Sequence, residues 1–377
     1  MTRLAPRPVR TARFARPVRF PALIAAAALL AVACGSGDDE SSEEPELGSE
    51  LAFDGGDDTT TTTAPSTTTT TTEPTTTTVP EVIAPLTGLG VAVTDAQLGR
   101  TALAVKIDNH PNARPQVGLS SADIVFDLRA EGVTRFMAVF HSDVPAEVGP
   151  VRSSRTSDFD LLRGLDRPLY ASSGGNAYVM GQVPNLPIFP VTNHTRREYF
   201  RQGGRPAPHN LFIEPSTLYE IVGDDAVSEG DPAPWFEYRA EGEELLAGAV
   251  PWEAMSVDFT NSPTVGFTWD AERAGWLRTQ DGAPHLDAAT EEQLAPENVV
   301  IMVTTYGVSA ADPNSPEVRS TGSGELVVLT DGHRIDGTWE RADASSPPVL
   351  LSAAGEPIAL TPGRTWVLYP ESGQISG

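Results

Sequence analysis

Two arginines that could bind an anion share one short motif. Arg152 and Arg155 are three residues apart in Gly-Pro-Val-Arg-Ser-Ser-Arg, directly before a segment with helical spacing. Guanidinium groups bind phosphate and carboxylate through paired hydrogen bonds, and the free N–H groups at the start of a helix favour an anion. We therefore predict a site for an anionic or polyhydroxylated ligand. Its residues would be Lys106, Asn109, Arg114, Arg135, Arg152, Arg155 and Asn210.

Lys106 is the one lysine among 26 basic residues, so the other 25 are arginines. In a chain with such a bias, a lysine at a strand position indicates a need for a compact ammonium group, which a planar guanidinium does not replace. The sequence is equally compatible with a buried network of ion pairs that only orders the fold. The pairs of that network would be Lys106 with Asp123 or Glu131, and Arg135 or Arg152 with Asp127 or Asp108.

A catalytic role would fall to an acidic residue acting with a histidine. The candidates are Asp108, Asp127 and Glu131, each with His209. Asp127 and Glu131 could form a glycosidase pair, although two acids four residues apart are more typical of salt-bridge partners. The sequence contains no serine-nucleophile motif and no His-Glu-x-x-His motif, and its six histidines are scattered. We therefore predict neither a metal site nor a cofactor.

The elements that position these residues belong to a mixed α/β domain, predicted over residues 83–224. Alternating or continuous apolar residues predict strands, and apolar residues at helical spacing predict helices. We expect Ser216 to cap the second helix. The predicted strands are 102–107, 123–128, 134–141 and 169–172, and the predicted helices are 156–165 and 216–222.

A β-rich domain is predicted over residues 256–377, after a polar linker at 225–255 that is rich in glycine, proline and acid. Strands are expected at 299–305 and 365–369. Residues 326–329 and 334–339 flank Asp331-Gly332, which is a strong hairpin signal. Five tryptophans could form a sugar-stacking surface, although packing within the sheets is their commoner role. They are Trp252, Trp269, Trp276, Trp339 and Trp366.

The first 33 residues have the features of an export signal. They carry six arginines and no acid, and an apolar run over 22–33 is too short to span a bilayer stably. The only cysteine of the chain, Cys34, follows Ala31-Val32-Ala33, where a bacterial lipoprotein signal places its lipid-bearing residue. Acyl chains on Cys34 would hold the protein at the cell membrane without a spanning helix. An ordinary secretory signal followed by a free thiol is the alternative.

Residues 34–82 are predicted to be a disordered tether. They contain twelve acids, runs of threonine and no lysine or arginine, so they bury too little apolar surface to offset the entropy of ordering. The whole chain has a formal charge of -25. Without the signal this becomes -31, of which the tether holds -12 and residues 83–377 hold -19. Such an excess of acid argues against nucleic acid as a partner.

Motifs along the whole folded part resemble the YerB-like lipoprotein family, which is the domain of unknown function 3048. Its N-terminal half is represented by Pro-Leu-Thr-Gly at 85–88, Ala-Val-Lys-Ile-Asp-Asn at 104–109, Gly-Pro-Val-Arg-Ser-Ser-Arg at 149–155 and Pro-His-Asn-Leu at 208–211. Its C-terminal half is represented by Gly-Thr-Trp at 337–339 and Pro-Gly-Arg-Thr-Trp at 362–366. One departure is Phe126-Asp127, where the family usually has Tyr-Glu, a longer carboxylate.

The resemblance covers about residues 85–372 and implies a lipoprotein with a mixed α/β N-terminal domain and a β-rich C-terminal domain. It implies no reaction. The sequence thus predicts a protein on the outer face of the cell membrane, anchored through Cys34, that binds a cell-wall glycan or its phosphate. An envelope hydrolase or transferase, and a non-catalytic scaffold that contacts other envelope proteins through its β-rich domain, are the competing hypotheses.

Overall fold

The computed structural model describes residues 81–92, 98–192, 198–260, 262 and 264–377. The predicted signal, Cys34 and all but the end of the predicted tether lie outside these residues. Glu81 and Val82, which end the predicted tether, belong to a strand that pairs with residues 90–92. From Glu81 on, the described residues belong to one compact unit. Within them, no helix has the length and apolarity needed to cross a membrane.

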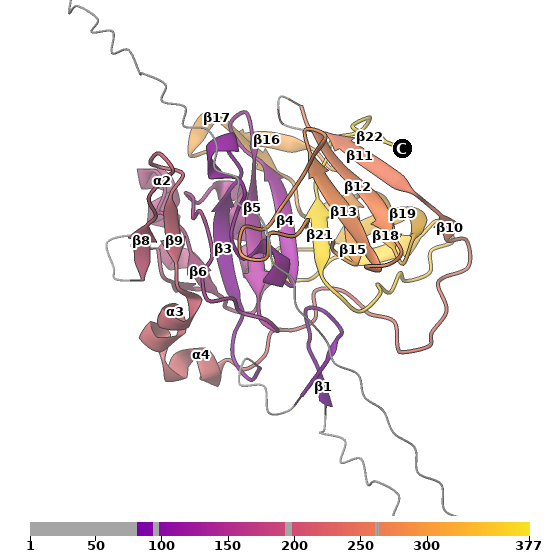
Figure 1. The fold of residues 1–377 in the computed structure, drawn as a ribbon, viewed down its shortest axis with the longest axis horizontal. Coiled ribbons are helices and arrows are strands. Elements are labelled where there is room, and N and C mark those ends of the chain that lie inside the picture. Colours follow the sequence, from indigo (N-terminus) through magenta and orange to yellow (C-terminus); the bar gives the residue numbers. More distant parts are fainter. Residues whose placement is uncertain (1–80, 93–97, 193–197, 261, 263) are drawn as a thin grey trace, which may run out of the picture. The chain divides into compact units, whose positions relative to one another are not determined.

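One large sheet runs through the molecule and contains eleven of the described strands. Its order is β10-β19-β18-β15-β21-β4-β5-β3-β6-β7, with β20 paired to β19. Figure 1 shows yellow β21, from the end of the chain, beside purple β4. The strands are β3 (Leu103–Asp108), β4 (Ile124–Arg129), β5 (Thr134–Phe140), β6 (Leu169–Ala171), β7 (Phe189–Pro190), β10 (Val250–Pro251), β15 (Asn298–Met302), β18 (Gly322–Thr330), β19 (His333–Arg341), β20 (Val349–Ser352) and β21 (Thr365–Leu368).

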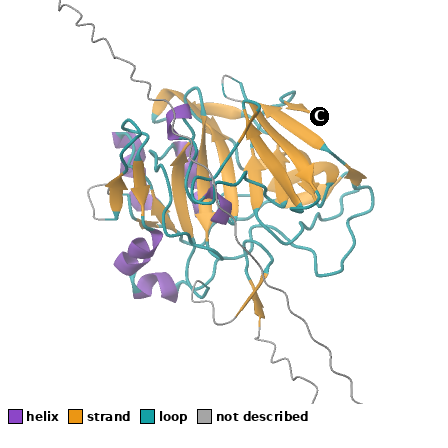
Figure 2. Cartoon of the chain, viewed as in Figure 1, coloured by secondary structure: helices purple, strands orange, loops and turns teal. Residues whose placement is uncertain are grey.

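A second, five-stranded sheet and three hairpins complete the described strands (Figure 2). The second sheet has the order β14-β13-β12-β11-β22. Its strands are β11 (Ala254–Asp258), β12 (Thr264–Asp270), β13 (Gly275–Gln280), β14 (Ala283–Pro284) and β22 (Ile375–Ser376). The hairpins are β1 (Glu81–Ile83) with β2 (Gly90–Ala92), β8 (Tyr199–Arg201) with β9 (Leu211–Ile213), and β16 (Tyr306–Ser309) with β17 (Asp312–Val318).

The described helices are short and all precede residue 229. The α-helices are α1 (Phe159–Arg163), α2 (Ala177–Gln182), α3 (Pro215–Val222) and α4 (Asp224–Ser228). The 3₁₀ turns are η1 (Pro111–Ala113), η2 (Leu119–Ser121), η3 (Thr156–Asp158) and η4 (Val183–Asn185). The predicted fold class, a mixed α/β part followed by a β-rich part, is confirmed.

The central strands of the large sheet, such as β3 and β5, are buried on both faces, and their residues alternate between two cores. Leu103, Val105 and Ile107 of β3 point into a core that includes the second sheet and α3. Ala104 points into the other core, which includes α1 and α2. We call the first side the β13 face and the second the α1 face. Every polar side chain on these strands therefore belongs to one face or the other.

The strands predicted at 102–107, 123–128 and 134–141 are confirmed as β3, β4 and β5, and the predicted hairpin is confirmed as β18–β19. The predicted cap of the second helix was wrong. Pro215 occupies the first turn and Glu214 is the capping residue, because proline has no N–H to satisfy and its fixed φ suits that position. In the predicted linker, Trp235 and Phe236 are buried in the α1-face core.

The tryptophans of the β-rich part mainly pack inside it. Trp276, Trp339 and Trp366 are buried, whereas Trp252 and Trp269 are partly buried against the β13-face core. Packing, rather than a stacking surface, is therefore their main role.

A fully buried ion pair connects β4 to the second sheet on the β13 face. The Arg278 Nη2 of β13 lies 2.9 Å from Asp127 Oδ2, and neither side chain is exposed. Burial lowers the pKa of Arg278 to about 10 and raises that of Asp127, while the attraction between the two groups opposes both shifts. Asp127 is thus sealed from solvent, and its partner is not one of the arginines predicted from the sequence.

Removing Asp127 should be strongly destabilising because Arg278 would remain buried without a counter-charge. We expect Asp127→Ala to lower the free energy of unfolding by about 3–5 kcal/mol, and Asp127→Leu combined with Arg278→Met to recover most of that loss. Urea denaturation measures both. The control is Asp336→Ala, which removes an exposed partner of Arg334 and should change little. A loss below about 1 kcal/mol for Asp127→Ala would contradict the assignment.

Candidate anion-binding site

The predicted motif at residues 149–155 runs across the end of β3. Ile107 pairs with Val151, the Asp108 N–H donates to Pro150 O at 2.9 Å, and the Arg152 N–H donates to Lys106 O at 2.7 Å. Arg135 of β5 lies opposite Asp108 in the sheet register, so the two side chains share the α1 face with Lys106. The motif and the strand ends therefore meet on one face of the sheet.

Lys106 lies beneath this surface and does not reach it. Its side chain is 1% exposed, and its Nζ is 2.6 Å from Oδ1 of Asp158, which is itself fully buried. Burial lowers the pKa of Lys106, and the charge and hydrogen bond of Asp158 oppose that shift. The predicted partners, Asp123 and Glu131, were wrong. Asp123 instead accepts hydrogen bonds from Ser142, and burial raises its pKa to about 6.

Asp158 has further partners that hold it in place. It accepts hydrogen bonds from Tyr170 Oη at 3.1 Å and from the Arg155 N–H at 2.8 Å, both on Oδ2. The second bond is half of a capping box, in which a residue three positions into a helix bonds back to the capping residue. Asp158 was not predicted, although its spacing from Arg155 is the sequence signal that would have found it.

Glu131 binds two of the predicted arginines. Arg155 donates to it from Nε at 2.6 Å and from Nη2 at 2.9 Å, and Arg135 Nη2 donates at 3.0 Å. Ser315 Oγ of β17 also donates to it. Burial alone would raise the pKa of Glu131, but hydrogen bonds from Arg155 and Ser315 and the arginine charges hold it at about 2. An ionised and fully occupied carboxylate does not suit acid–base catalysis.

Arg152 is the arginine of this cluster with an open guanidinium. Its side chain is 23% exposed, and its Nε lies 3.4 Å from Asp108 Oδ2. Among the described residues, no hydrogen bond engages its two terminal nitrogens. The ion pairs around Arg152 contain four positive and three negative charges, which leaves a local excess of one positive charge. The cations are Lys106, Arg135, Arg152 and Arg155, and the anions are Asp108, Glu131 and Asp158. Burial, then the charge of Arg155, lowers the pKa of Arg135 to about 10.

The buried Asp108 and the partly exposed His209 form a second feature beside Arg152. His209 Nδ1 lies 2.7 Å from Asp108 Oδ2, and the His110 N–H donates to Asp108 Oδ1 at 3.0 Å. The rings of His110 and His209 stack with centroids 4.2 Å apart. A carboxylate on Nδ1 favours the tautomer with the hydrogen there, so Nε2 accepts a hydrogen bond when the ring is neutral and donates one when it is protonated.

The other predicted residues lie elsewhere. Asn109 is one position beyond Asp108 and donates a hydrogen bond to Thr134 on the β13 face. On that face Arg114 donates to Asn109 and forms an ion pair with Asp281. Asn210 is 9% exposed and accepts a bond from Arg201 while donating to Gln202 O at 3.1 Å. It thereby closes the loop that carries His209. Asp127 and Glu131 are on different faces and cannot act as a glycosidase pair.

Among the described residues, no group of three or more histidine, cysteine or acidic side chains is placed to hold a metal ion. The partly exposed guanidinium of Arg152 and imidazole of His209 on this face instead suit an anion. We call Arg152, His209 and their supports Asp108, Arg135, Arg155 and Glu131 the Arg152 cluster.

Two family models match most of the folded part. The "Protein of unknown function (DUF3048) N-terminal domain" matches residues 86–228, and the corresponding C-terminal domain matches residues 255–367. The chain belongs to the DUF3048 family. This confirms the resemblance inferred from the motifs. The Arg152 cluster lies within the N-terminal match, whereas the Asp127–Arg278 pair joins the two.

A Bacillus subtilis (strain 168) protein named "Putative lipoprotein YerB" is 29% identical over 296 aligned residues, and the match covers 75% of this DUF3048 chain and 85% of that protein. The crystal structure of YerB from Bacillus subtilis superimposes with a TM-score of 0.68 at 25% identity, and the match covers 78% of this chain and 99% of that structure. The described fold is thus similar to an experimentally determined one along nearly the whole of that relative.

Glu131 should stabilise the fold in a pH-dependent way. Its folded pKa of about 2 lies below the ordinary 4.5, so its stabilisation is complete above pH 4.5 and is lost as the pH falls toward 2. We expect Glu131→Gln to lower the free energy of unfolding at pH 7 by about 1–3 kcal/mol, a range reduced for the partial exposure of the group. The difference from wild type should shrink between pH 4.5 and 3 in urea titrations.

Glu241→Gln, at an exposed glutamate, is the control and should show little difference at either pH. A Glu131→Gln difference that stays constant down to pH 3 would show that the ion pairs of Glu131 contribute no stability.

Proposed function

We propose that this DUF3048 protein is an exported lipoprotein, anchored on the outer face of the cell membrane through Cys34, whose folded part binds an anionic group of a cell-envelope polymer. The anchor is supported by the basic and apolar signal before the single cysteine and by the name of the Bacillus subtilis relative. The length and composition of the following residues suit a spacer between membrane and folded part.

The open guanidinium of Arg152 carries the proposal for binding. Arg155 and Arg135 donate hydrogen bonds to Glu131, so their guanidinium groups are not free to bind a ligand. Their positive charges still favour an anion nearby. Arg152 keeps two terminal nitrogens for a phosphate or carboxylate, and His209 Nε2 adds a neighbouring polar group. Charge-assisted, two-pronged hydrogen bonds of this kind are the strong ones in proteins.

The acidic background makes such a site selective. Residues 83–377 hold a net charge of -19, so an anionic polymer is repelled by most of the surface. Binding would then depend on a short anionic group that reaches Arg152. A wall glycan, or the phosphate attached to it, supplies such a group.

A hydrolase or transferase is the second candidate, favoured by the 2.7 Å contact of His209 with Asp108. An aspartate that orients a histidine can support general-base catalysis. Here Arg152 would hold the anionic substrate, and His209 Nε2 would accept a proton from water. Release of wall fragments by the wild type but not by His209→Gln would favour this activity over binding alone.

Arg152→Ala should weaken retention on purified wall polymer at least about tenfold, since it removes a charge-assisted contact. Co-sedimentation of the full chain with the polymer measures this. Arg163→Ala is a matched control, because Arg163 is a partly exposed arginine paired with Asp160. Polymer stripped of phosphate and carboxylate should retain neither the wild type nor Arg163→Ala. Equal retention of wild type and folded Arg152→Ala would instead favour the scaffold hypothesis.

The anchor makes a separate prediction. Wild-type protein should fractionate with membranes and carry the mass of attached lipid, whereas Cys34→Ser should be recovered in the soluble fraction, because acyl chains provide the membrane affinity. Mass spectrometry and membrane fractionation check this. A Cys34→Ser protein that still fractionates with membranes would contradict lipid anchoring at Cys34.

A further inference from the structure

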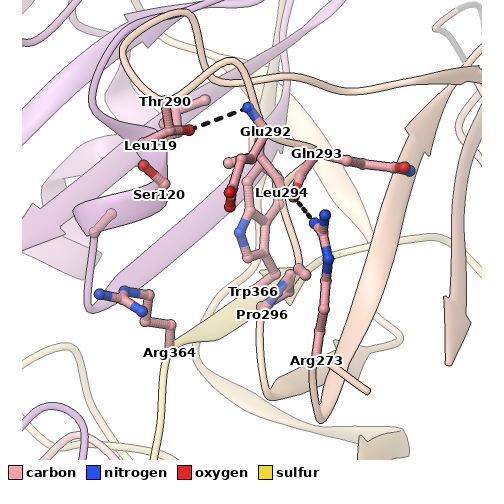
Figure 3. Close-up of a pocket in the computed structure, with 12 residues that line it drawn as sticks. Leu119, Ser120, Arg273, Thr290, Glu292, Gln293, Leu294, Pro296, Arg364 and Trp366 are labelled. Carbon is pink, nitrogen blue, oxygen red and sulfur yellow. Dashed lines mark hydrogen bonds between the residues drawn. The ribbon is translucent and has the colours of Figure 1, made fainter. Parts of the chain in front are cut away.

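A cavity of about 420 Å³ lies where the two family-matched parts of the chain meet (Figure 3). Its walls are η2 from the N-terminal part, the loop at 287–296, and the beginning of β21. The volume falls in the range of about 300–1,000 Å³ that is usual for small-ligand sites. The lining includes Ser120, Arg273, Thr290, Glu292, Arg364 and Trp366.

Asp287 fixes two of these walls to each other. Its carboxylate is fully buried and accepts from the Gly118 N–H at 3.1 Å and from both the N–H and Oγ of Ser120, at 2.8 and 2.9 Å. It also accepts from the Ala289 N–H of its own loop at 2.8 Å. The cavity is therefore pre-formed, which lowers the entropy lost on binding.

Two donors at the cavity lack hydrogen-bond partners. Within the described part of the chain, no hydrogen bond engages the indole nitrogen of Trp366 or the guanidinium of Arg364, and Arg364 forms only a long ion pair of 3.8 Å with Asp143. The indole nitrogens of Trp235, Trp252 and Trp276 are unpaired and sealed, but that of Trp366 is not sealed. The guanidinium carbon of Arg278 lies 4.3 Å from the centroid of the Trp366 ring and covers one face of it. The N–H edge of the ring, rather than that face, is therefore the part that a ligand in the cavity could contact.

The charges and acceptors limit the ligand. Arg273 and Arg364 lie on opposite sides of the Trp366 indole in Figure 3, and Glu292 also lines the cavity. Arg273 donates to Gln293 O, whereas the Arg364 guanidinium forms no hydrogen bond with the described residues and so can bind an anionic group. Glu292 forms no ion pair among the described residues, so its carboxylate can accept from ligand hydroxyls. The hydroxyls of Ser120 and Thr290 lie on the same walls.

We propose that this cavity binds an acidic sugar, a hydroxylated ring with one carboxylate. Arg364 and the Trp366 N–H would bind the carboxylate, and Glu292 would accept from the ring hydroxyls. This proposal is independent of the function proposed above. Trp366 belongs to the β13-face core, whereas the Arg152 cluster is on the α1 face, so each site can fail without the other.

The test is a titration of the full chain with D-glucuronate, followed through indole N–H signals in ¹H–¹⁵N NMR spectra. The Trp366 signal is assigned by its absence from Trp366→Phe, which keeps an aromatic ring. We expect glucuronate to shift this signal with a Kd on the order of 1 mM, as for a ligand of its size. Methyl glucoside, which lacks the charge, and acetate, which lacks the ring, should bind at least about tenfold more weakly.

Arg364→Gln should weaken glucuronate binding at least about tenfold. Arg163→Gln is the matched control, because the exposed fractions of Arg163 and Arg364 are 37% and 38%, and it should bind as wild type does. Arg152→Ala should also bind as wild type does. The proposal is overturned by an unshifted Trp366 signal, by equal affinity for methyl glucoside or acetate, by unchanged binding to Arg364→Gln, or by loss of binding in Arg152→Ala.

Discussion

The buried ion pair between Lys106 and Asp158 positions the Arg152 cluster. It connects β3 to η3, so the intervening motif at 150–158 must follow the end of β3. Desolvating two charges is costly unless further hydrogen bonds satisfy them, and Asp158 receives such bonds from Tyr170 and from the Arg155 N–H. The compact ammonium that the sequence singled out is therefore an anchor beneath the site, and Arg152 is the group above it that remains open.

Both family-matched parts contribute to the sites, because the large sheet is continuous between them. β21 lies between β4 and β15, and Arg278 of β13 neutralises Asp127 of β4. Ser315, from the C-terminal match, donates to Glu131 in the Arg152 cluster. The cavity lined by Ser120 and Arg364 has a wall from each part. Neither part would retain these arrangements if the other were removed.

The sequence predicted what is local and missed what depends on pairing. Apolar runs identified β3, β4 and β5 because strand alternation is encoded residue by residue. The partner of Lys106 is 52 residues away and was missed, since pairing over that distance depends on how the whole sheet is assembled. Lys106 and Asn109 were assigned to one site, but residues an odd number of positions apart along a strand point to opposite faces. The resemblance to a family gave the architecture and no chemistry.

The proposed site requires that no protein carboxylate occupies the two terminal nitrogens of Arg152, whose Nε faces Asp108. A crystal structure of the full chain grown with tungstate, which mimics phosphate and is located by its anomalous scattering, tests this most directly. We expect the anion within hydrogen-bond distance of the Arg152 terminal nitrogens and beside His209 Nε2, with Lys106 still on Asp158. A structure in which those nitrogens are bonded to a protein carboxylate, with tungstate bound elsewhere, would contradict an anion site at Arg152.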